Sequence, residues 1–369
     1  MASPFYRLLL ISTPVGALGS GLGGGVELFI KNATQGLRQR GHSITVVAPE
    51  KSVLDTCDRL IGIPGTFQPT AHTSDRTAPV VMPEPSVLSA MWEYARQVQA
   101  EYDLILHYAY DWLPFYLTPF FQTPIAHYIS MSSLSDVLDQ AMGHVAKHFP
   151  GTVGVCTQVQ AETFPFAQHC RLIGSSVDLK LYDYCDAPGD ALAWLGRISP
   201  EKGLEDAIAA VQATQTPLKI LGKLENLDYW HRLQATFPDA PIEYLGFLPT
   251  HEMQAVMRTC RALLMTPKWI EAFGNVAIEA LACGVPIISY RRGGPTEIIR
   301  EGETGWLVEP DSVAELIAAI QKIGQLNRQA CRQQAETDFS LAAMASRYEA
   351  WFGDIMAAFE QHSGKFSGC

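Results

Sequence analysis

Two cations in the C-terminal half have a spacing suited to binding phosphate. Arg197 and Lys202 lie in the segment GRISPEKG, which follows an expected strand and opens an expected helix. Open α/β sheets bind ligands at the carboxyl ends of their strands. An arginine can contact two phosphate oxygens at once and a lysine adds a mobile point charge, so the pair predicts a phosphate site. The alternative is a surface arginine beside a lysine at a helix start.

Two carboxylates, Glu271 and Glu279, lie further along in the segment EAFGNVAIE. On one continuous helix they would be about 12 Å apart along the axis and on different faces, which excludes an acid/base dyad sharing a proton. A helix beginning near Gly274 would leave Glu271 above its amino end, with the backbone N–H groups of Phe273–Val276 facing a diphosphate. Carboxylates accept hydrogen bonds from vicinal hydroxyls, so one could hold a sugar and the other a ribose. Two exposed helix carboxylates are the alternative.

A glycine-rich loop lies near the N-terminus. The segment Gly19–Gly24 fits the G-x-G-x-x-G pattern of a dinucleotide site, with Glu50 after the next expected strand. About five residues separate this loop from the strand that ends at Thr13, whereas the fingerprint begins at the strand end, which disfavours an NAD-dependent oxidoreductase. Gly24 and Gly25 open a helix instead, where a backbone without Cβ atoms could approach a phosphate. A turn requiring glycine for positive φ explains the loop equally well.

These segments need a scaffold of alternating strands and helices, and the apolar pattern predicts two such series. Residues 51–85, rich in Pro, Thr and Ser, are expected to form a long loop. Strands are expected at 7–13, 44–47, 103–106, 124–128, 152–155, 191–196, 217–221, 242–245, 262–266 and 285–289. Helices are expected from Val26 to Leu37 and at about 86–100, 203–213, 226–236, 250–258, 274–283, 312–323 and 340–360.

Composition bounds the classes of protein. The 369 residues are 47% hydrophobic and 18% charged, which predicts two globular domains and excludes a disordered, coiled-coil or collagen-like chain. The net charge of −11 argues against binding nucleic acid or anionic lipid. No apolar run reaches the ~18–20 residues of a membrane-spanning helix, and the first apolar run is too short for a signal peptide, so we expect a cytoplasmic protein. None of the eight cysteines forms a C-x-x-C pair, which leaves a zinc site unsupported.

The segments GRISPEKG and EAFGNVAIEALACGVPIISYRRGGPTEIIREGETGWLVEP resemble the retaining glycosyltransferases of family four. The likeness covers most of the C-terminal half; the N-terminal half matches more loosely, through the Gly24–Gly25–Val26 loop and the strand ending in His127. It implies an α/β fold of the GT-B type, with two Rossmann-like domains facing a central cleft. The domains would be 1–172, with a C-terminal helix (about 342–369) crossing back to it, and 173–341.

The resemblance implies catalytic roles for four residues. Glu271 would contact the hydroxyls of a donor hexose, while Arg197 and Lys202 would neutralise its diphosphate. His127 would meet the sugar 6-hydroxyl and the transferring centre, although a lone histidine after a strand is more often structural.

Further donor contacts are implied by the same resemblance. Glu279 would hold the ribose hydroxyls and Phe247 would lie at the nucleobase. Gly24 and Gly25 would approach the diphosphate from the other domain. The backbone N–H donors would be those of Phe273, Gly274, Asn275 and Val276.

The implied reaction is transfer of a hexose, with anomeric retention, from a nucleotide diphosphate to an acceptor hydroxyl. UDP-glucose is the expected donor, bound as a substrate, with no permanent cofactor. No D-x-D motif appears where a divalent ion would be needed, so the protein's own cations are expected to replace a metal. A non-catalytic nucleotide-sugar sensor is the other alternative.

The acceptor is expected to bind mainly to the N-terminal domain, where aromatic residues are dense between 102 and 128. Aromatic rings facing a cleft could stack on a planar heterocycle; an aromatic-rich core is the alternative. The weaker acceptor candidates are His107, Tyr108, Tyr110, Asp111 and Trp112. The chain also resembles pteridine-glucosylating members of the family, which implies a pteridine acceptor such as tetrahydrobiopterin; other small sugars or natural products stay open, and no membrane lipid is expected. The oligomeric state stays unassigned.

Overall fold

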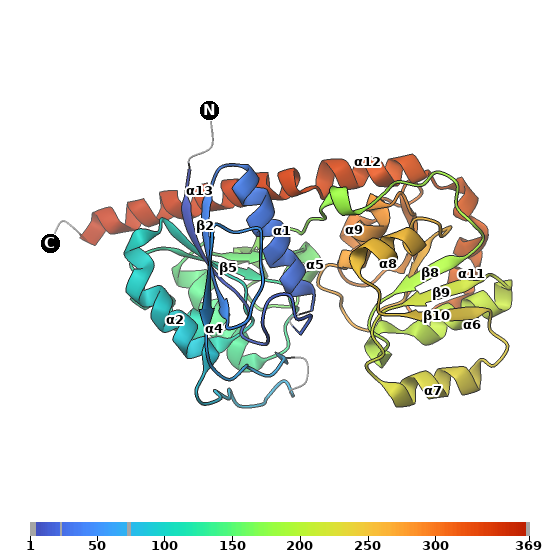
Figure 1. Cartoon of the computed structure of the whole chain (residues 1–369), viewed down its shortest axis with the longest axis horizontal. Coiled ribbons are helices and arrows are strands. Elements are labelled where there is room, and N and C mark those ends of the chain that lie inside the picture. The colour runs from blue at the N-terminus through green and yellow to red at the C-terminus, as the bar shows by residue number, and fades with distance from the viewer. Residues whose placement is uncertain (1–4, 23, 72–74, 367–369) are drawn as a thin grey trace. The chain divides into compact units, whose positions relative to one another are not determined.

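The computed structural model describes residues 5–22, 24–71 and 75–366, which form two α/β units (Figure 1). Unit 1 comprises residues 1–175 and 341–369, and unit 2 comprises residues 176–340. Each unit contains one sheet whose strands are all parallel. Strands of such sheets are buried on both faces and read as continuous apolar runs, as Leu8–Ile11 does.

The sheet of unit 1 has the strand order β3-β2-β1-β4-β5-β6-β7. Its strands are β1 (Arg7–Ile11), β2 (Ser43–Pro49), β3 (Arg59–Ile63), β4 (Leu104–His107), β5 (Ile125–Ile129), β6 (Val153–Val155) and β7 (Arg171–Leu172). Its α-helices are α1 (Gly25–Gln39), α2 (Val87–Val98), α3 (Trp112–Leu117), α4 (Asp136–His148), α5 (Gln158–Ala161) and α13 (Leu341–Phe366). Because β2 and β4 flank β1 on opposite sides, the strand order reverses direction between β1 and β4.

Helix α13 belongs to unit 1 although unit 2 precedes it in the chain, and it packs against α1 (Figure 1). The Tyr348 hydroxyl is 2.7 Å from that of Tyr108, and Trp351 Nε1 donates to the Gly151 carbonyl at 2.6 Å. Glu349 accepts hydrogen bonds from Arg40 and from the buried His42 ring. These contacts satisfy buried polar groups and fix the helix on the unit.

The sheet of unit 2 has the order β10-β9-β8-β11-β12-β13, which reverses between β8 and β11. Its strands are β8 (Leu192–Leu195), β9 (Leu218–Leu221), β10 (Ile242–Gly246), β11 (Leu263–Met265), β12 (Ile287–Tyr290) and β13 (Gly305–Val308). Its α-helices are α6 (Leu204–Thr214), α7 (Leu227–Thr236), α8 (Thr250–Met257), α9 (Asn275–Ala282), α10 (Pro295–Ile298), α11 (Val313–Gln321) and α12 (Arg328–Asp338). A short 3₁₀ helix, η6 (Pro200–Lys202), precedes α6.

The predicted fold class of two parallel α/β units is confirmed, with differences in detail. The loop predicted over 51–85 contains β3, whose residues are mostly half-buried because it is an edge strand beside β2. Residues 72–74 of that loop, and residues 367–369 of the predicted C-terminal helix, lie outside the described residues. Within the described residues, no helix is both long and apolar enough to span a bilayer.

Candidate functional site

The predicted donor residues of unit 2 gather where its strand order reverses. Arg197 and Lys202 follow β8, and Glu271 follows the neighbouring strand β11. Loops leaving adjacent parallel strands in opposite directions leave a crevice at the carboxyl edge, and this switch point is where such sheets bind ligands. The fold therefore brings together residues about 70 positions apart in the chain.

Lys202 and Glu271 form an ion pair, with Lys202 Nζ 2.5 Å from Glu271 Oε2. Their side chains are 20% and 17% exposed, so both are sheltered but reachable. A backbone contact holds the segment around Lys202, because the Lys268 amide donates to the carbonyl of the neighbouring residue, Glu201, at 2.9 Å. Gly203 has φ +64°, and a Cβ there would lie 2.0 Å from the Thr266 carbonyl, so only glycine permits this approach.

A pair of glycines after β12 holds the backbone around Glu271. The Gly294 amide donates to the Glu271 carbonyl at 2.7 Å. A Cβ on Gly294 would lie 2.3 Å from the Phe273 carbonyl oxygen, and one on Gly293 would lie 2.5 Å from that of Glu271. No side chain fits in either gap, so these glycines keep the segment before α9 in place.

Several groups act on the Glu271 carboxylate. Burial pushes its pKa upward, but the Lys202 ammonium, the Trp269 indole N–H and the Arg197 guanidinium outweigh burial and hold the pKa below its usual value. Trp269 Nε1 donates to Glu271 Oε2 at 3.0 Å. Arg197 pairs with Glu201 at 3.0 Å and also with Glu225. The carboxylate is therefore ionised at neutral pH and able to accept hydrogen bonds.

Glu279 is the second acidic residue of the site and lies within α9. The Tyr182 hydroxyl donates to Glu279 Oε1 at 3.0 Å. Burial raises the pKa of Glu279 to about 7, against the lowering effect of that hydrogen bond. No hydrogen bond to the second oxygen, Glu279 Oε2, is found in the described part of the chain, so this oxygen can accept one from a hydroxyl group. With this pKa, the carboxyl gains full acceptor strength only as the pH rises through 7.

The start of α9 lies between the two acids. Gly274 precedes the helix with φ +98°, and a Cβ there would lie 3.2 Å from the Met265 methyl. Phe273 is buried against Phe339, while Asn275 and Val276 occupy the first turn and are half-buried. The first N–H groups of a helix have no partner within it, which makes this end suited to an anion.

Phe247 directly follows β10 and is 76% exposed. Its strand is separated from β8 by β9, so it lies at the same carboxyl edge but beyond the ion pair. A flat, exposed ring at this edge is suited to stacking on a planar group. The structure shows no contact between Phe247 and Lys202 or Glu271.

The structure places His127, expected at the transferring centre, in the middle of β5, where it is 0% exposed. Thr118 Oγ1 donates to the Pro114 carbonyl, so it accepts from His127 Nε2, and His127 Nδ1 then accepts from His107 Nδ1 at 2.9 Å. Burial lowers the pKa of His127 to about 3 and that of His107 well below its ordinary value. Both rings are neutral core groups, and His107 Nε2, which has no hydrogen-bond partner among the described residues, is itself buried.

Two of the five acceptor candidates are likewise core residues. His107 belongs to the pair just described, and Tyr108 is 2% exposed and bonded to Tyr348. Tyr110, Asp111 and Trp112 are half-buried after β4, at the switch point of unit 1. Burial raises the pKa of Asp111 to about 7. The aromatic density between 102 and 128 therefore serves the core for the most part.

The glycine-rich loop of unit 1 already holds an anionic group of the chain itself. Glu27 Oε2 accepts from the Gly19 amide at 2.7 Å and from the Gly21 amide at 3.3 Å. Gly24, with φ +58°, and Gly25 are exposed at the start of α1, as predicted from the helical spacing. Gly23 lies outside the described residues. The engaged amides of Gly19 and Gly21 argue against a pyrophosphate there.

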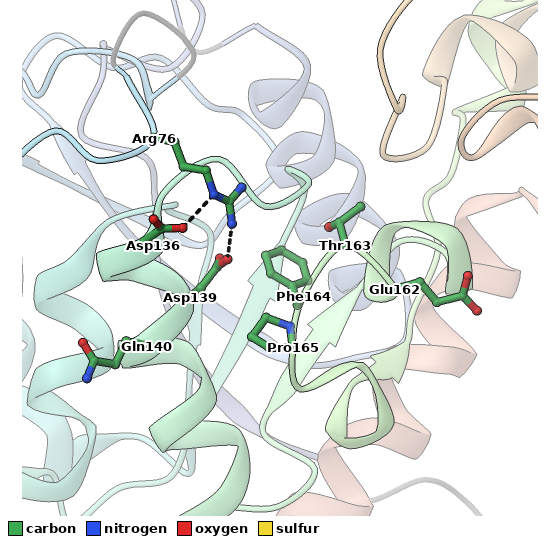
Figure 2. A pocket seen from close by; sticks show the side chains of 8 residues that line it. All are labelled: Arg76, Asp136, Asp139, Gln140, Glu162, Thr163, Phe164 and Pro165. Atoms are coloured by element: carbon green, nitrogen blue, oxygen red, sulfur yellow. Dashed lines mark hydrogen bonds and ion pairs between the residues drawn. The ribbon is translucent and has the colours of Figure 1, made fainter.

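A cavity of about 540 Å³ opens in unit 1 beside the start of α4 (Figure 2). Arg76, from the loop after β3, binds Asp136 at 2.6 Å and Asp139 at 3.0 Å. Figure 2 shows this guanidinium directed at the two aspartates, with Phe164 and Pro165 forming the facing wall. Because two carboxylates neutralise its one cation, this cavity lacks the positive charge that a diphosphate needs.

Sequence reasoning missed three contributors to the site of unit 2. Trp269 lies only two residues before Glu271, and an aromatic residue there was a usable signal. Tyr182 is 97 positions from its partner Glu279, and nothing in the local pattern indicates that contact. The pair Gly293–Gly294 was visible in the sequence, but its closeness to Glu271 depends on the path of β12.

Comparisons with known proteins agree with this geometry. Residues 190–338 match the family described as "Glycosyl transferases group 1". Glycogen synthase of Mycobacterium tuberculosis is 32% identical over 173 residues, which cover 42% of this chain and 40% of that protein. Matches to the curated relatives cover only 18–44% of their own lengths.

Similarity to solved structures extends over nearly the whole chain. Sucrose-phosphate synthase from Thermosynechococcus elongatus has a TM-score of 0.69 at 18% identity, over 98% of this chain and 100% of that one. HepE of Anabaena, in complex with UDP and glucose, has a TM-score of 0.67 at 19% identity, over 99% and 100%. These likenesses establish the two-domain GT-B fold. The likeness to the glycosyl transferases group 1 family rests on the match of residues 190–338, within unit 2.

Proposed function

We propose that this protein transfers a hexose from a nucleotide diphosphate sugar to a hydroxyl of a small acceptor, with retention of anomeric configuration. The observation that carries the proposal is the meeting of Lys202, Arg197 and Glu271 at the switch point of unit 2, directly before the amino end of α9. Cations and helix N–H groups suit the diphosphate, while Glu271 and Glu279 on either side suit hydroxyls of the sugar and of the ribose.

The chemistry asked of these groups is mainly electrostatic. In the proposed step the bond between the anomeric carbon and the diphosphate oxygen breaks and a bond to the acceptor oxygen forms. The acceptor proton passes to a phosphate oxygen of the departing nucleoside diphosphate. Charge on that leaving group grows in the transition state, so Lys202, Arg197 and the start of α9 bind it more tightly there than in the ground state.

Glucose from UDP-glucose is the proposed donor group, supported by the resemblance of the sequence motifs and by the ligands named for HepE. The proposed acceptor is a small soluble molecule binding at the carboxyl edge of the unit 1 sheet, near Tyr110, Asp111 and Trp112. A pteridine such as tetrahydrobiopterin is the first acceptor to test, because Trp112 is a half-buried aromatic residue at this edge.

Three measurements test the proposal. Thermal denaturation with UDP, GDP, ADP and NAD should show protection by one nucleoside diphosphate; protection by NAD alone would identify an oxidoreductase. Mass spectrometry should then detect a hexosylated product and release of the nucleotide when UDP-glucose and tetrahydrobiopterin, or a panel of sugars, are supplied. NMR of the product shows whether the anomeric configuration is retained. Tight binding without turnover on any acceptor would favour a sensor.

A further inference from the structure

Trp269 touches both members of the ion pair in unit 2. Its indole Nε1 donates to Glu271 Oε2 at 3.0 Å, and Lys202 Nζ contacts the same oxygen at 2.5 Å. The Lys202 ammonium also lies 5.0 Å from the centre of the indole ring, within cation–π range. One carboxylate oxygen therefore receives two donors, whereas no hydrogen bond to Glu271 Oε1 is found among residues 5–22, 24–71 and 75–366.

The two donors differ in how firmly they are held. Lys202 reaches the carboxylate through a flexible four-carbon chain, whereas the indole N–H is fixed to a rigid ring with two rotatable bonds. This inference rests on the proposed function, in which a diphosphate attracts Lys202. When the ammonium turns toward phosphate, Glu271 loses its nearest cation while still sheltered from water. A sheltered carboxylate without partners is strongly disfavoured.

We propose that Trp269 is a positioning residue, which holds Glu271 through Oε2 when Lys202 moves to the donor diphosphate and so directs Oε1 at the sugar hydroxyls. Trp269 then matters for the sugar half of the donor and not for the nucleotide half. Removing the indole N–H should weaken binding of a nucleotide sugar and leave binding of the bare nucleoside diphosphate unchanged.

The variant Trp269→Phe isolates the N–H, because phenylalanine keeps an aromatic face for Lys202. Trp306→Phe is the matched control, since the buried Nε1 of Trp306 in β13 has no hydrogen-bond partner in the described part of the chain. Calorimetry with UDP and UDP-glucose should show that Trp269→Phe weakens UDP-glucose binding roughly tenfold, as expected for one hydrogen bond to a charged group. Its affinity for UDP, and both affinities of Trp306→Phe, should match the wild type.

A double-mutant cycle shows whether Trp269 acts through Glu271. In the Glu271→Gln background, Trp269→Phe should cause little further loss, because contacts within one network are not additive. The acidic limb of the pH profile for transfer should move to higher pH in Trp269→Phe, since the indole N–H helps to lower the pKa of Glu271. A merely structural tryptophan would shift neither quantity.

The outcomes separate this inference from the proposed function. Equal weakening of UDP and UDP-glucose, or an unchanged effect of Trp269→Phe in the Glu271→Gln background, would show that Trp269 only packs and would overturn the inference. A wild-type protein that binds no nucleotide overturns the proposed function and the premise of this inference together. A matching melting temperature of Trp269→Phe and wild type confirms that folding is not the cause of either result.

Discussion

The two sheets reverse their strand order in the same way but place opposite chemistry at the reversal. In unit 2 the loops after β8 and β11 carry Lys202 and Glu271, charged and reachable from solvent. In unit 1, β4 at the reversal and the next strand, β5, carry His107 and His127, which are neutral and sealed in the core. Shared topology therefore fixes where a ligand can bind, while side chains on the strands or on the loops decide whether charge is available there.

The difference arises from a shift of a few residues along the strand. His107 and His127 lie within β4 and β5, where side chains alternate between the buried faces of the sheet. Lys202 and Glu271 lie beyond the last paired residues of β8 and β11, where the chain has left the sheet. Substitutions that change one of these two regions and not the other test this contrast.

The largest expected effect is on transfer by Glu271→Gln. The amide keeps the size of the side chain but loses its charge, so the rate should fall about 10²–10³-fold, as when an electrostatic contact to a transition state is removed. Steady-state assays of nucleotide release give the measurement. Glu336→Gln, which changes an exposed glutamate on α12, is the control and should retain wild-type activity.

Gly294→Ala should have the next largest effect on transfer. Its Cβ would collide with the backbone of Phe273 and displace Glu271, and a shift of about 1 Å in a catalytic group can lower the rate about 100-fold. Gly324→Ala is the matched control, because a Cβ at Gly324 has no neighbour within 4 Å. Equal activity of the two variants would contradict the role given to the glycine pair.

Lys202→Met removes the cation and should lower kcat/KM for the nucleotide sugar about 10–100-fold, the range expected for a charged hydrogen bond. Lys202 lowers the pKa of Glu271, so that pKa should rise in the variant. Glu271 would then protonate at a higher pH, and the acidic limb of the activity profile should move upward. An unshifted profile would show that Glu271 ionises independently of Lys202.

The smallest effect on transfer is expected in unit 1, from His127→Gln. The substitution breaks the chain linking Thr118, His127 and His107, so the free energy of unfolding should fall by about 1–3 kcal/mol with transfer retained. Denaturant titration of the whole protein gives the measurement, with hydrogen exchange of the unit 1 amides as the probe. A large loss of transfer without loss of stability would restore His127 to the site.

The same histidines also predict how stability depends on pH. Their pKa values are lower in the folded protein than the ordinary 6.5, so the unfolded chain binds more protons below that pH. Stability should therefore decline as the pH falls below about 6.5 toward 3, and His127→Gln should reduce this dependence.

Much of the scaffold was predictable from the sequence because apolar periodicity records burial. The charged residues of unit 2 were also predictable, since GRISPEKG and EAFGNVAIE place them next to strands and a helix start. The burial of His127 was not predictable, because the local sequence pattern is the same whether the ring of a histidine in an apolar run points into the core or toward solvent. Contacts between distant positions, such as Tyr182 with Glu279, depend on tertiary packing that no local pattern records.

The return of α13 to unit 1 has a consequence for biosynthesis. At about 5–20 residues per second, a ribosome needs roughly 10–30 s to synthesise unit 2, which precedes α13 in the chain. During that interval the nascent unit 1 lacks Tyr348, Trp351 and Phe352, which complete its apolar interior. The first unit to begin synthesis is thus the last to be completed, and until α13 emerges the surface that this helix covers stays open to water.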